Sequence, residues 1–132
     1  MLIVGPQIGA GIGRRVHECN MNDDWVLKFE TSSGSFQNIM EWETWQEVED
    51  CEYAEHFAPC EYISPNGVIL IQRRTRPVVK EMLPKRMPAF FCDFKPDNFG
   101  LLDGKLVCHD YGYSRLLTQG LSKKMRNADW WE

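Results

Sequence analysis

The stretch Cys92-Asp93-Phe94-Lys95-Pro96-Asp97-Asn98, followed twelve residues later by Asp110-Tyr111-Gly112, decides the expected fold of this chain. Between the two segments, residues 99–102 and 105–108 flank Asp103-Gly104, a dipeptide typical of tight hairpin turns. A loop and the end of the adjacent hairpin can bring Asp93, Asn98 and Asp110 together. Carboxylate and amide oxygens are the ligands that Mg²⁺ prefers. The sequence therefore predicts a polar site beside a short hairpin.

Upstream, the sequence predicts a small antiparallel sheet. Residues 14–19 alternate and residues 25–29 are mostly apolar, as expected for strands. Residues 60–63 and 68–72 surround Ser64-Pro-Asn-Gly67 and form the clearest hairpin signal of the chain. The glycine-rich start is expected to be flexible and able to bring its backbone close to a ligand.

One amphipathic helix is expected at residues 36–50. Its pattern places Phe36, Ile39, Met40, Trp42, Trp45 and Val48 near helical spacing, with glutamates between them. Ser35 is the expected N-cap. Residues 73–86 are expected to form a hinge followed by at most a short helix. Residues 119–132 are expected to form a short closing helix, with Trp130 and Trp131 docking on the body.

The pattern D-x-K-P-x-N, then D-aromatic-G, with V-x-K upstream, resembles the catalytic core of eukaryotic-type protein kinases. In that resemblance Asp93 is the catalytic base and Lys95 steadies the transferred phosphate. Asn98 and Asp110 are the magnesium ligands. Lys28 is the strand lysine that holds the α- and β-phosphates of ATP.

The same resemblance implies a helix glutamate that pairs with Lys28. Glu41 is the preferred candidate because Trp45, one turn later, would pack inward beneath it; Glu43 and Glu47 remain open. The resemblance also implies a nucleotide-binding group made of Gly9, Gly11, Gly13, Val16, Lys28 and Gln72. The third glycine of the usual phosphate loop is replaced by Arg14, with Gly13 one place early.

Several positions depart from the kinase pattern. Phe91 and Cys92 stand where the family has His-Arg, so regulation by a phosphorylated loop is not expected. Tyr111 replaces the Phe of D-F-G. Few residues separate the hinge from Asp93, and 20 follow Gly112. The helical lobe that binds a peptide in the family is therefore expected to be reduced to a stub.

The expected fold class is α/β (α+β), a minimal kinase-like fold. A five-stranded antiparallel sheet with one helix forms a first part, residues 1–74. A catalytic hairpin module and tail form a second part, residues 75–132. The expected function is ATP- and Mg²⁺-dependent phosphoryl transfer, to Ser or Thr of a protein.

Two alternatives stay open. One is a weakly active or inactive kinase-like protein that binds and regulates a partner through the acidic helix face between Glu41 and Glu55. The other is a small-molecule kinase, because a peptide platform is missing. The tail with Trp130 and Trp131 is a candidate surface for homo-oligomer formation.

Composition narrows the class of protein. The net charge is −4, with −9 in residues 1–66 and +5 in residues 67–132. No single basic face is indicated, so a nucleic-acid partner is not expected. Five unpaired cysteines and no signal sequence favour free thiols in the cytoplasm. No apolar run approaches the roughly 20 residues of a membrane span.

Overall fold

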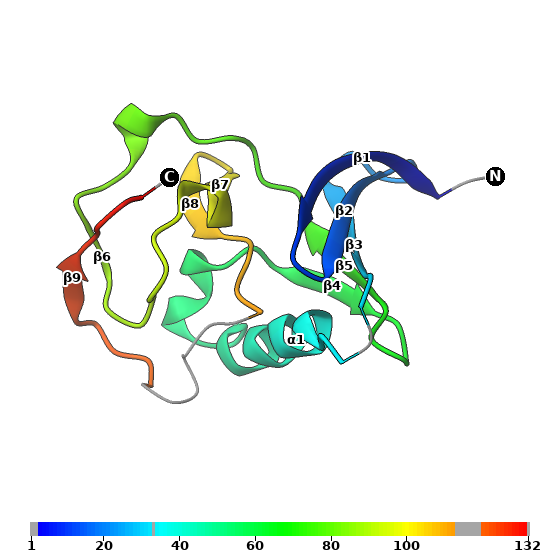
Figure 1. Cartoon of the computed structure of the whole chain (residues 1–132). Coiled ribbons are helices and arrows are strands. Elements are labelled where there is room, and N and C mark those ends of the chain that lie inside the picture. The colour runs from blue at the N-terminus through cyan, green and yellow to red at the C-terminus, as the bar shows by residue number, and fades with distance from the viewer. Residues whose placement is uncertain (1–2, 33, 113–119, 132) are drawn as a thin grey trace.

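The computed structural model describes residues 3–32, 34–112 and 120–131 (Figure 1). Its largest element is a five-stranded antiparallel sheet with the strand order β1-β2-β3-β5-β4. The mixed α+β class and the five-stranded sheet with one helix agree with the sequence expectation for this part of the chain. The strands are β1 (Val4–Gly11), β2 (Arg14–Cys19), β3 (Trp25–Glu30), β4 (Cys60–Ile63) and β5 (Ile69–Arg73).

The glycine-rich start is a strand rather than a flexible segment. β1 pairs with β2 as far as Gly11 opposite Arg14, with irregular register near Gln7. Gly13 turns the chain with a φ of 84°, a left-handed value that glycine adopts without strain. The ladder therefore fixes the positions of Gly9 and Gly11 beside the first residues of β2.

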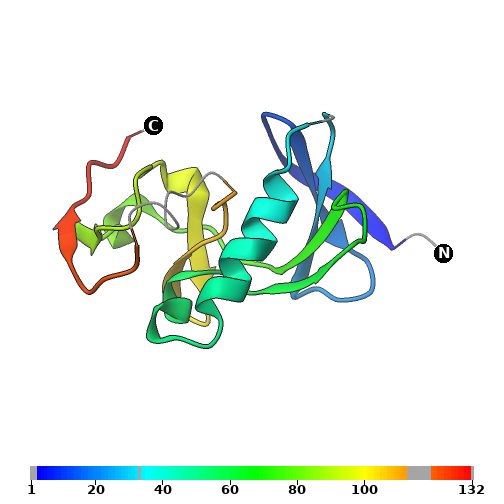
Figure 2. The same cartoon turned by 90° about the horizontal axis from the view of Figure 1, so that it is seen from below.

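Helix α1 (Gln37–Val48) packs against the sheet at β3, β4 and β5, and Figure 2 shows it from below. The expected N-cap was wrong: Phe36 occupies that position with a φ of 55° and no side-chain cap bond. Instead, the backbone N–H of Asn38 donates to Glu30 Oε1 at 2.6 Å. A carboxylate from the preceding strand thus accepts one of the unpaired N–H groups of the first turn.

The buried face of α1 is also different from the expected apolar face. Its buried residues are Gln37, Asn38, Glu41, Thr44 and Val48, so four of the five are polar. Phe36 and Met40, expected to face the core, are exposed. Trp42 and Trp45 are partly buried and pack against the hydrophobic core as expected. The helix buries polar groups because its partners on the sheet side are charged side chains and turn carbonyls.

The hairpin expected after residue 98 is present. β7 (Phe99–Leu102) pairs with β8 (Lys105–Cys108), and Asp103 and Gly104 join them with φ values of 51° and 81°. Two positive φ values at the centre of a two-residue turn are the signature that Asp-Gly favours. The loop before β7 includes a short 3₁₀ helix, η3 (Pro96–Asn98).

The closing helix expected at residues 119–132 is not found in the part of this segment that the structure describes. Residues 113–119 and 132 lie outside the described chain, and residues 120–131 contain no helix but a short strand, β9 (Met125–Asn127). This strand pairs with β6 (Arg86–Pro88). Between the end of β5 at Arg73 and the start of β6 at Arg86, the only helix is the short 3₁₀ helix η2 (Lys80–Met82). This agrees with the expectation of at most a short helix in residues 73–86. Another 3₁₀ helix, η1 (Glu52–His56), follows α1.

The hydrophobic core is rich in aromatic side chains and is built from α1, from β4 and β5 of the sheet, from the β7–β8 hairpin and from the segments that join them. Phe91 packs against Phe57, Phe90 and Phe99 at ring-centroid distances of 5.4, 4.8 and 5.4 Å. Phe91 thus fills apolar space within this core. All five cysteines are free thiols, as expected. Among the described residues, no helix is long and apolar enough to cross a membrane.

Candidate functional site

A cleft of about 860 Å³ opens between the sheet and the loop that precedes β7. It gathers residues from the glycine-rich hairpin, from β3 and β5, and from the loop and hairpin that carry the two motifs. Most of the residues expected to act together line it: Gly9, Gly11, Val16, Lys28, Gln72, Asp93, Lys95, Asn98 and Asp110. Gly13 and Glu41 are not part of its lining.

Lys28 and Glu41 form a buried ion pair. Lys28 Nζ lies 2.6 Å from Glu41 Oε1, and the two side chains are 2% and 0% exposed. Glu43 and Glu47, the open alternatives, lie on the exposed side of α1. The expected pairing of Lys28 with Glu41 is therefore confirmed. Two charges removed from water need further partners to offset their desolvation.

Asp110 supplies one of those partners. Its Oδ1 lies 3.2 Å from Lys28 Nζ and 3.1 Å from Arg14 Nη2. Burial works to raise the pKa of Asp110, but the cationic groups around it, of which Lys28 contributes most, hold that pKa at about 2. Asp110 is consequently a carboxylate throughout the physiological pH range.

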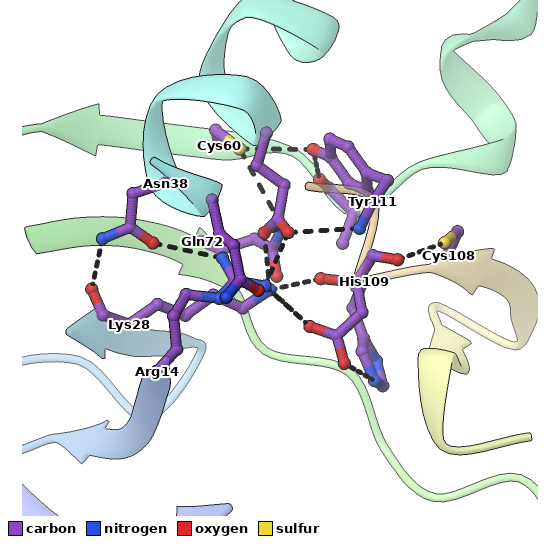
Figure 3. Close-up of polar contacts among 12 residues, drawn as sticks. Arg14, Lys28, Asn38, Cys60, Gln72, Cys108, His109 and Tyr111 are labelled. Carbon is purple, nitrogen blue, oxygen red and sulfur yellow. Dashed lines mark hydrogen bonds and ion pairs between the residues drawn. The ribbon is translucent and has the colours of Figure 1, made fainter. Parts of the chain in front are cut away.

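Arg14 completes the cluster, and sequence reasoning missed its role. Its Nη2 donates to Glu41 Oε2 at 2.8 Å, and its Nη1 donates to Asn38 Oδ1 at 3.1 Å. Figure 3 shows Arg14, Lys28 and Asn38 approaching one another beneath α1. Arg14 and Val16 lie on the same face of β2, because side chains alternate along a strand. That alternation was the available signal, since Val16 was already expected to face the nucleotide.

These side chains form a closed set that we call the charge quartet: Arg14, Lys28, Glu41 and Asp110. Two cations face two carboxylates, so its formal charge is balanced. Lys28 also donates to the backbone carbonyl of His109. Arg14, Lys28 and Glu41 are at most 6% exposed, whereas Asp110 is 39% exposed. Asp110 is therefore the member of the quartet that a ligand in the cleft can reach most easily.

Asn98 is tied to Asp110 through the backbone. The carbonyl oxygen of Asn98 accepts hydrogen bonds from the N–H of His109 at 2.9 Å and of Asp110 at 3.3 Å. His109 is held by Thr75 Oγ1 and by the Asp97 carbonyl, and burial lowers its pKa. Both ring nitrogens of His109 are thus engaged in contacts that fix the position of the ring.

The donor set fits Mg²⁺ better than a metal held by protein alone. Within residues 3–32, 34–112 and 120–131, no group of three or more His, Cys, Asp or Glu side chains is arranged to hold a metal ion. Asp110 and Asn98 offer one carboxylate and one amide oxygen. Magnesium keeps several waters and takes its remaining ligands from substrate phosphates, so such a pair suits it.

Asp93 and Lys95 lie at the opposite side of the cleft, where the tail contacts both. The indole N–H of Trp131 donates to Asp93 Oδ1 at 2.9 Å, and Lys95 Nζ lies 5.6 Å from the centre of the Trp131 ring. Phe94, between the two site residues, is buried against Trp130. The docking of both tryptophans on the body was expected, but the contact of Trp131 with Asp93 and Lys95 was not.

Tyr111 and Gly112 attach this site to the helix. Tyr111 is buried, donates its hydroxyl to the Ala58 carbonyl at 2.7 Å, and donates its backbone N–H to Glu41 Oε2 at 3.1 Å. A Cβ at position 112 would lie 2.9 Å from the backbone oxygen of Gln37. Glycine is therefore required here by the close approach of the chain to α1.

Gln72 is fully buried at the inner end of the cleft. Its Nε2 donates to Glu41 Oε1 at 3.2 Å, which orients the amide. In the described chain its Oε1 is buried without a hydrogen-bond partner. An unpaired buried carbonyl is costly, so this oxygen is suited to accept a hydrogen bond from a ligand or a water molecule.

Comparison with family models, with curated proteins and with solved structures finds no match for this chain.

Proposed function

We propose that this protein is an ATP- and Mg²⁺-dependent phosphotransferase of the kinase-like type. One observation carries the proposal: a single cleft is lined by Lys28, Asp93, Lys95, Asn98 and Asp110. These are the residue types that phosphoryl transfer needs, namely cations for phosphates, oxygen ligands for a metal and a carboxylate beside the acceptor. Their order along the chain and their convergence in space are independent facts that agree.

In this proposal each residue has one task. Lys28, held by Glu41, binds phosphate oxygens of the nucleotide, and Asn98 and Asp110 would hold Mg²⁺. When bound, the ion would neutralise the charge that develops on the transferred group. Asp93 orients the acceptor hydroxyl and accepts its proton, while the ammonium of Lys95 stabilises the phosphoryl group in transit.

The acceptor we propose first is a Ser or Thr hydroxyl of a protein. A small-molecule acceptor is the second candidate, and the structure of the tail favours it. In residues 120–131 the chain forms β9 and the contacts of Trp130 and Trp131 instead of helices, so no broad platform for a peptide is found there. A screen of protein and small-molecule hydroxyl acceptors with radiolabelled ATP separates the two.

A non-catalytic binding role rests on a different observation. Glu43 and Glu47 are exposed on α1, Glu49 is exposed directly after its last residue, and Glu52 and Glu55 continue the acidic surface along η1. Reversal of Glu47 and Glu49 to Lys would abolish such binding and leave nucleotide binding intact. Asp110→Ala would leave such binding intact and abolish the Mg²⁺-dependent part of nucleotide binding.

The deciding experiment is a thermal shift assay with ATP and Mg²⁺ on the wild type and on Asp110→Ala. A ligand that binds only the folded state must raise its stability. We expect a Mg²⁺-dependent rise in Tm for the wild type that is lost in the variant. No shift at millimolar ATP would overturn the proposal and leave the acidic surface as the functional region.

A further inference from the structure

We propose that Arg14 is a phosphate-binding residue that exchanges its ion pair with Asp110 for the nucleotide phosphates. The proposal rests on the proposed function, because it names a further residue of the same nucleotide site. It concerns the position where the kinase pattern has a glycine and this chain has an arginine. A glycine offers only backbone to a phosphate, whereas an arginine offers a charged, forked donor.

The position of Arg14 fits this role. It is the first residue of β2, directly after the Gly11–Gly13 turn, and it lines the cleft together with Lys28. Its guanidinium is anchored on one side by Asn38, which is itself 0% exposed. Asn38 is fixed in turn by donating to the backbone carbonyls of Lys28 and Gly67 at 2.9 and 3.1 Å. Arg14 is therefore held at the cleft wall by a rigid partner.

The contacts of Arg14 differ in how easily they can be exchanged. Its contact with Glu41 is 2.8 Å long and involves a carboxylate with no exposed surface. Its contact with Asp110 is 3.1 Å long, and that carboxylate is 39% exposed to the cleft. The Asp110 contact is thus the longer and the more accessible of the two. An incoming anion competes for this contact first.

The charge balance of the quartet explains why Arg14 and Lys28 can attract phosphates only after Asp110 has left them. With Asp110 engaged by both cations, Arg14 and Lys28 have no surplus positive charge to offer. Once Asp110 turns away, the two cations face only Glu41 and carry a net formal charge of +1 toward the phosphates. The freed Asp110 then becomes available as an oxygen ligand for Mg²⁺. Phosphate binding and metal binding by Asp110 are consequently coupled through Arg14.

The test is ATP affinity measured by isothermal titration calorimetry, first in EDTA and then with Mg²⁺. Without metal, the phosphates depend on protein cations alone, so Arg14→Gln should bind ATP at least tenfold more weakly than the wild type. With Mg²⁺ we expect a smaller loss, about threefold, because the ion supplies charge. Arg14→Lys should recover part of the affinity in EDTA. Arg15→Gln is the matched control, since Arg15 is the exposed neighbour on the other face of β2 and should bind ATP like the wild type.

A double-mutant cycle with Asp110 keeps the proposal falsifiable if Arg14→Gln is poorly folded. In EDTA, Asp110→Asn should raise ATP affinity at least threefold by releasing Arg14, and this gain should shrink in an Arg14→Lys background. The same variant should lose the Mg²⁺ enhancement of binding.

Three results would overturn the inference. A folded Arg14→Gln that binds ATP in EDTA within twofold of the wild type removes Arg14 from the site. An Asp110→Asn gain that is independent of Arg14 shows that the two residues do not exchange. If the wild type binds ATP neither with Mg²⁺ nor in EDTA, the proposed function fails and the inference fails with it. If the wild type binds ATP and Arg14→Gln binds it equally well, only the inference fails.

Discussion

Trp131 and Asp93 are joined by a hydrogen bond of 2.9 Å from the indole N–H to Oδ1, so a tail residue holds the carboxylate that is expected to orient the acceptor. Two further contacts hold Trp131 in place. Its backbone N–H donates to the Phe94 carbonyl, and the ammonium of Lys95 lies over its ring. The tail therefore lines the cleft at the place where Asp93 and Lys95 lie.

Replacing Trp131 by Phe should lower turnover without weakening nucleotide binding. The change keeps an aromatic ring beside Lys95 but removes the indole N–H, the only hydrogen-bond donor of the side chain. Asp93 Oδ1 then loses its hydrogen bond from the tail. One hydrogen bond is worth about 0.5–1.5 kcal/mol, which corresponds to a roughly 2- to 10-fold lower rate. The measurement is steady-state ATP hydrolysis with water as acceptor. An unchanged kcat with a raised KM for ATP would place Trp131 at the nucleotide instead.

The buried ion pair on α1 should matter for stability far more than its exposed neighbours. Glu41→Gln leaves Lys28 and Arg14 with too few carboxylate partners, and breaking a buried pair costs about 3–5 kcal/mol. The matched change Glu47→Gln, on the exposed side of the same helix, should stay within about 0.5 kcal/mol of the wild type. Urea unfolding of both variants measures the difference. Equal effects would contradict the burial of Glu41 in the folded protein.

Acidification should weaken the protein through Asp110. Its pKa is about 2 in the folded state and about 3.9 in an unfolded chain. A depressed folded pKa gives stability that is fully present above the unfolded value and lost as the pH falls from about 4 toward 2. The stability gap between the wild type and Asp110→Asn should therefore shrink between pH 6 and pH 3 in urea titrations. A gap that stays constant over this pH range would contradict the assignment to Asp110.

The hydroxyl of Tyr111 should contribute measurably to the stability of the core. Tyr111→Phe removes the bond to the Ala58 carbonyl and the 3.2 Å contact with Cys60 Sγ. Loss of a buried hydrogen bond costs about 1–3 kcal/mol when the partner is left unpaired. Thermal unfolding of the variant should show the corresponding fall in Tm. A neutral result would mean that water replaces the hydroxyl at Ala58.

Thiol reactivity should report on the cleft. Cys92 is exposed and lines the cleft, whereas Cys60 and Cys108 are buried. Burial raises the pKa of Cys60 to about 12 and raises that of Cys108 well above its ordinary value. N-ethylmaleimide at pH 7.5 should therefore modify Cys92 first, as followed by mass spectrometry, and Cys92→Ser should lack this fast phase. Protection of Cys92 by ATP and Mg²⁺ is expected; equal rates with and without nucleotide would count against binding in this cleft.

Much of the fold followed from local signals in the sequence. Two turn sequences, Asp103-Gly104 and Pro65-Asn66-Gly67, are typical of short hairpin connections. The strands on either side of each turn could therefore be predicted within a residue or two. The Lys28–Glu41 pair was expected from the resemblance to the kinase pattern, with Glu41 preferred because Trp45, one turn later, would pack inward, and the two side chains do form a buried ion pair. The catalytic roles of these residues stay predictions.

What the sequence did not reveal depends on contacts between distant segments. The helix cap at Asn38 comes from Glu30 on the preceding strand, not from the adjacent Ser35. The polar buried face of α1 exists only because Arg14 and Lys28 lie opposite it. The hydrophobic periodicity of the helix sequence carries no information about such charged partners on other segments. The β6–β9 pairing joins residues that no local pattern connects.

The Arg14–Asp110 contact also bears on how the molecule folds and unfolds. The two residues are separated by 96 positions, and Lys28 and Asp110 by 82. Closing such long loops costs chain entropy before any interaction is gained, so these contacts are expected to form after the hairpins and the helix. Interactions absent from the folding transition state control how fast the native state is lost. The charge quartet would then act mainly as a kinetic lock, in which substitutions speed unfolding while the rate of folding stays nearly the same.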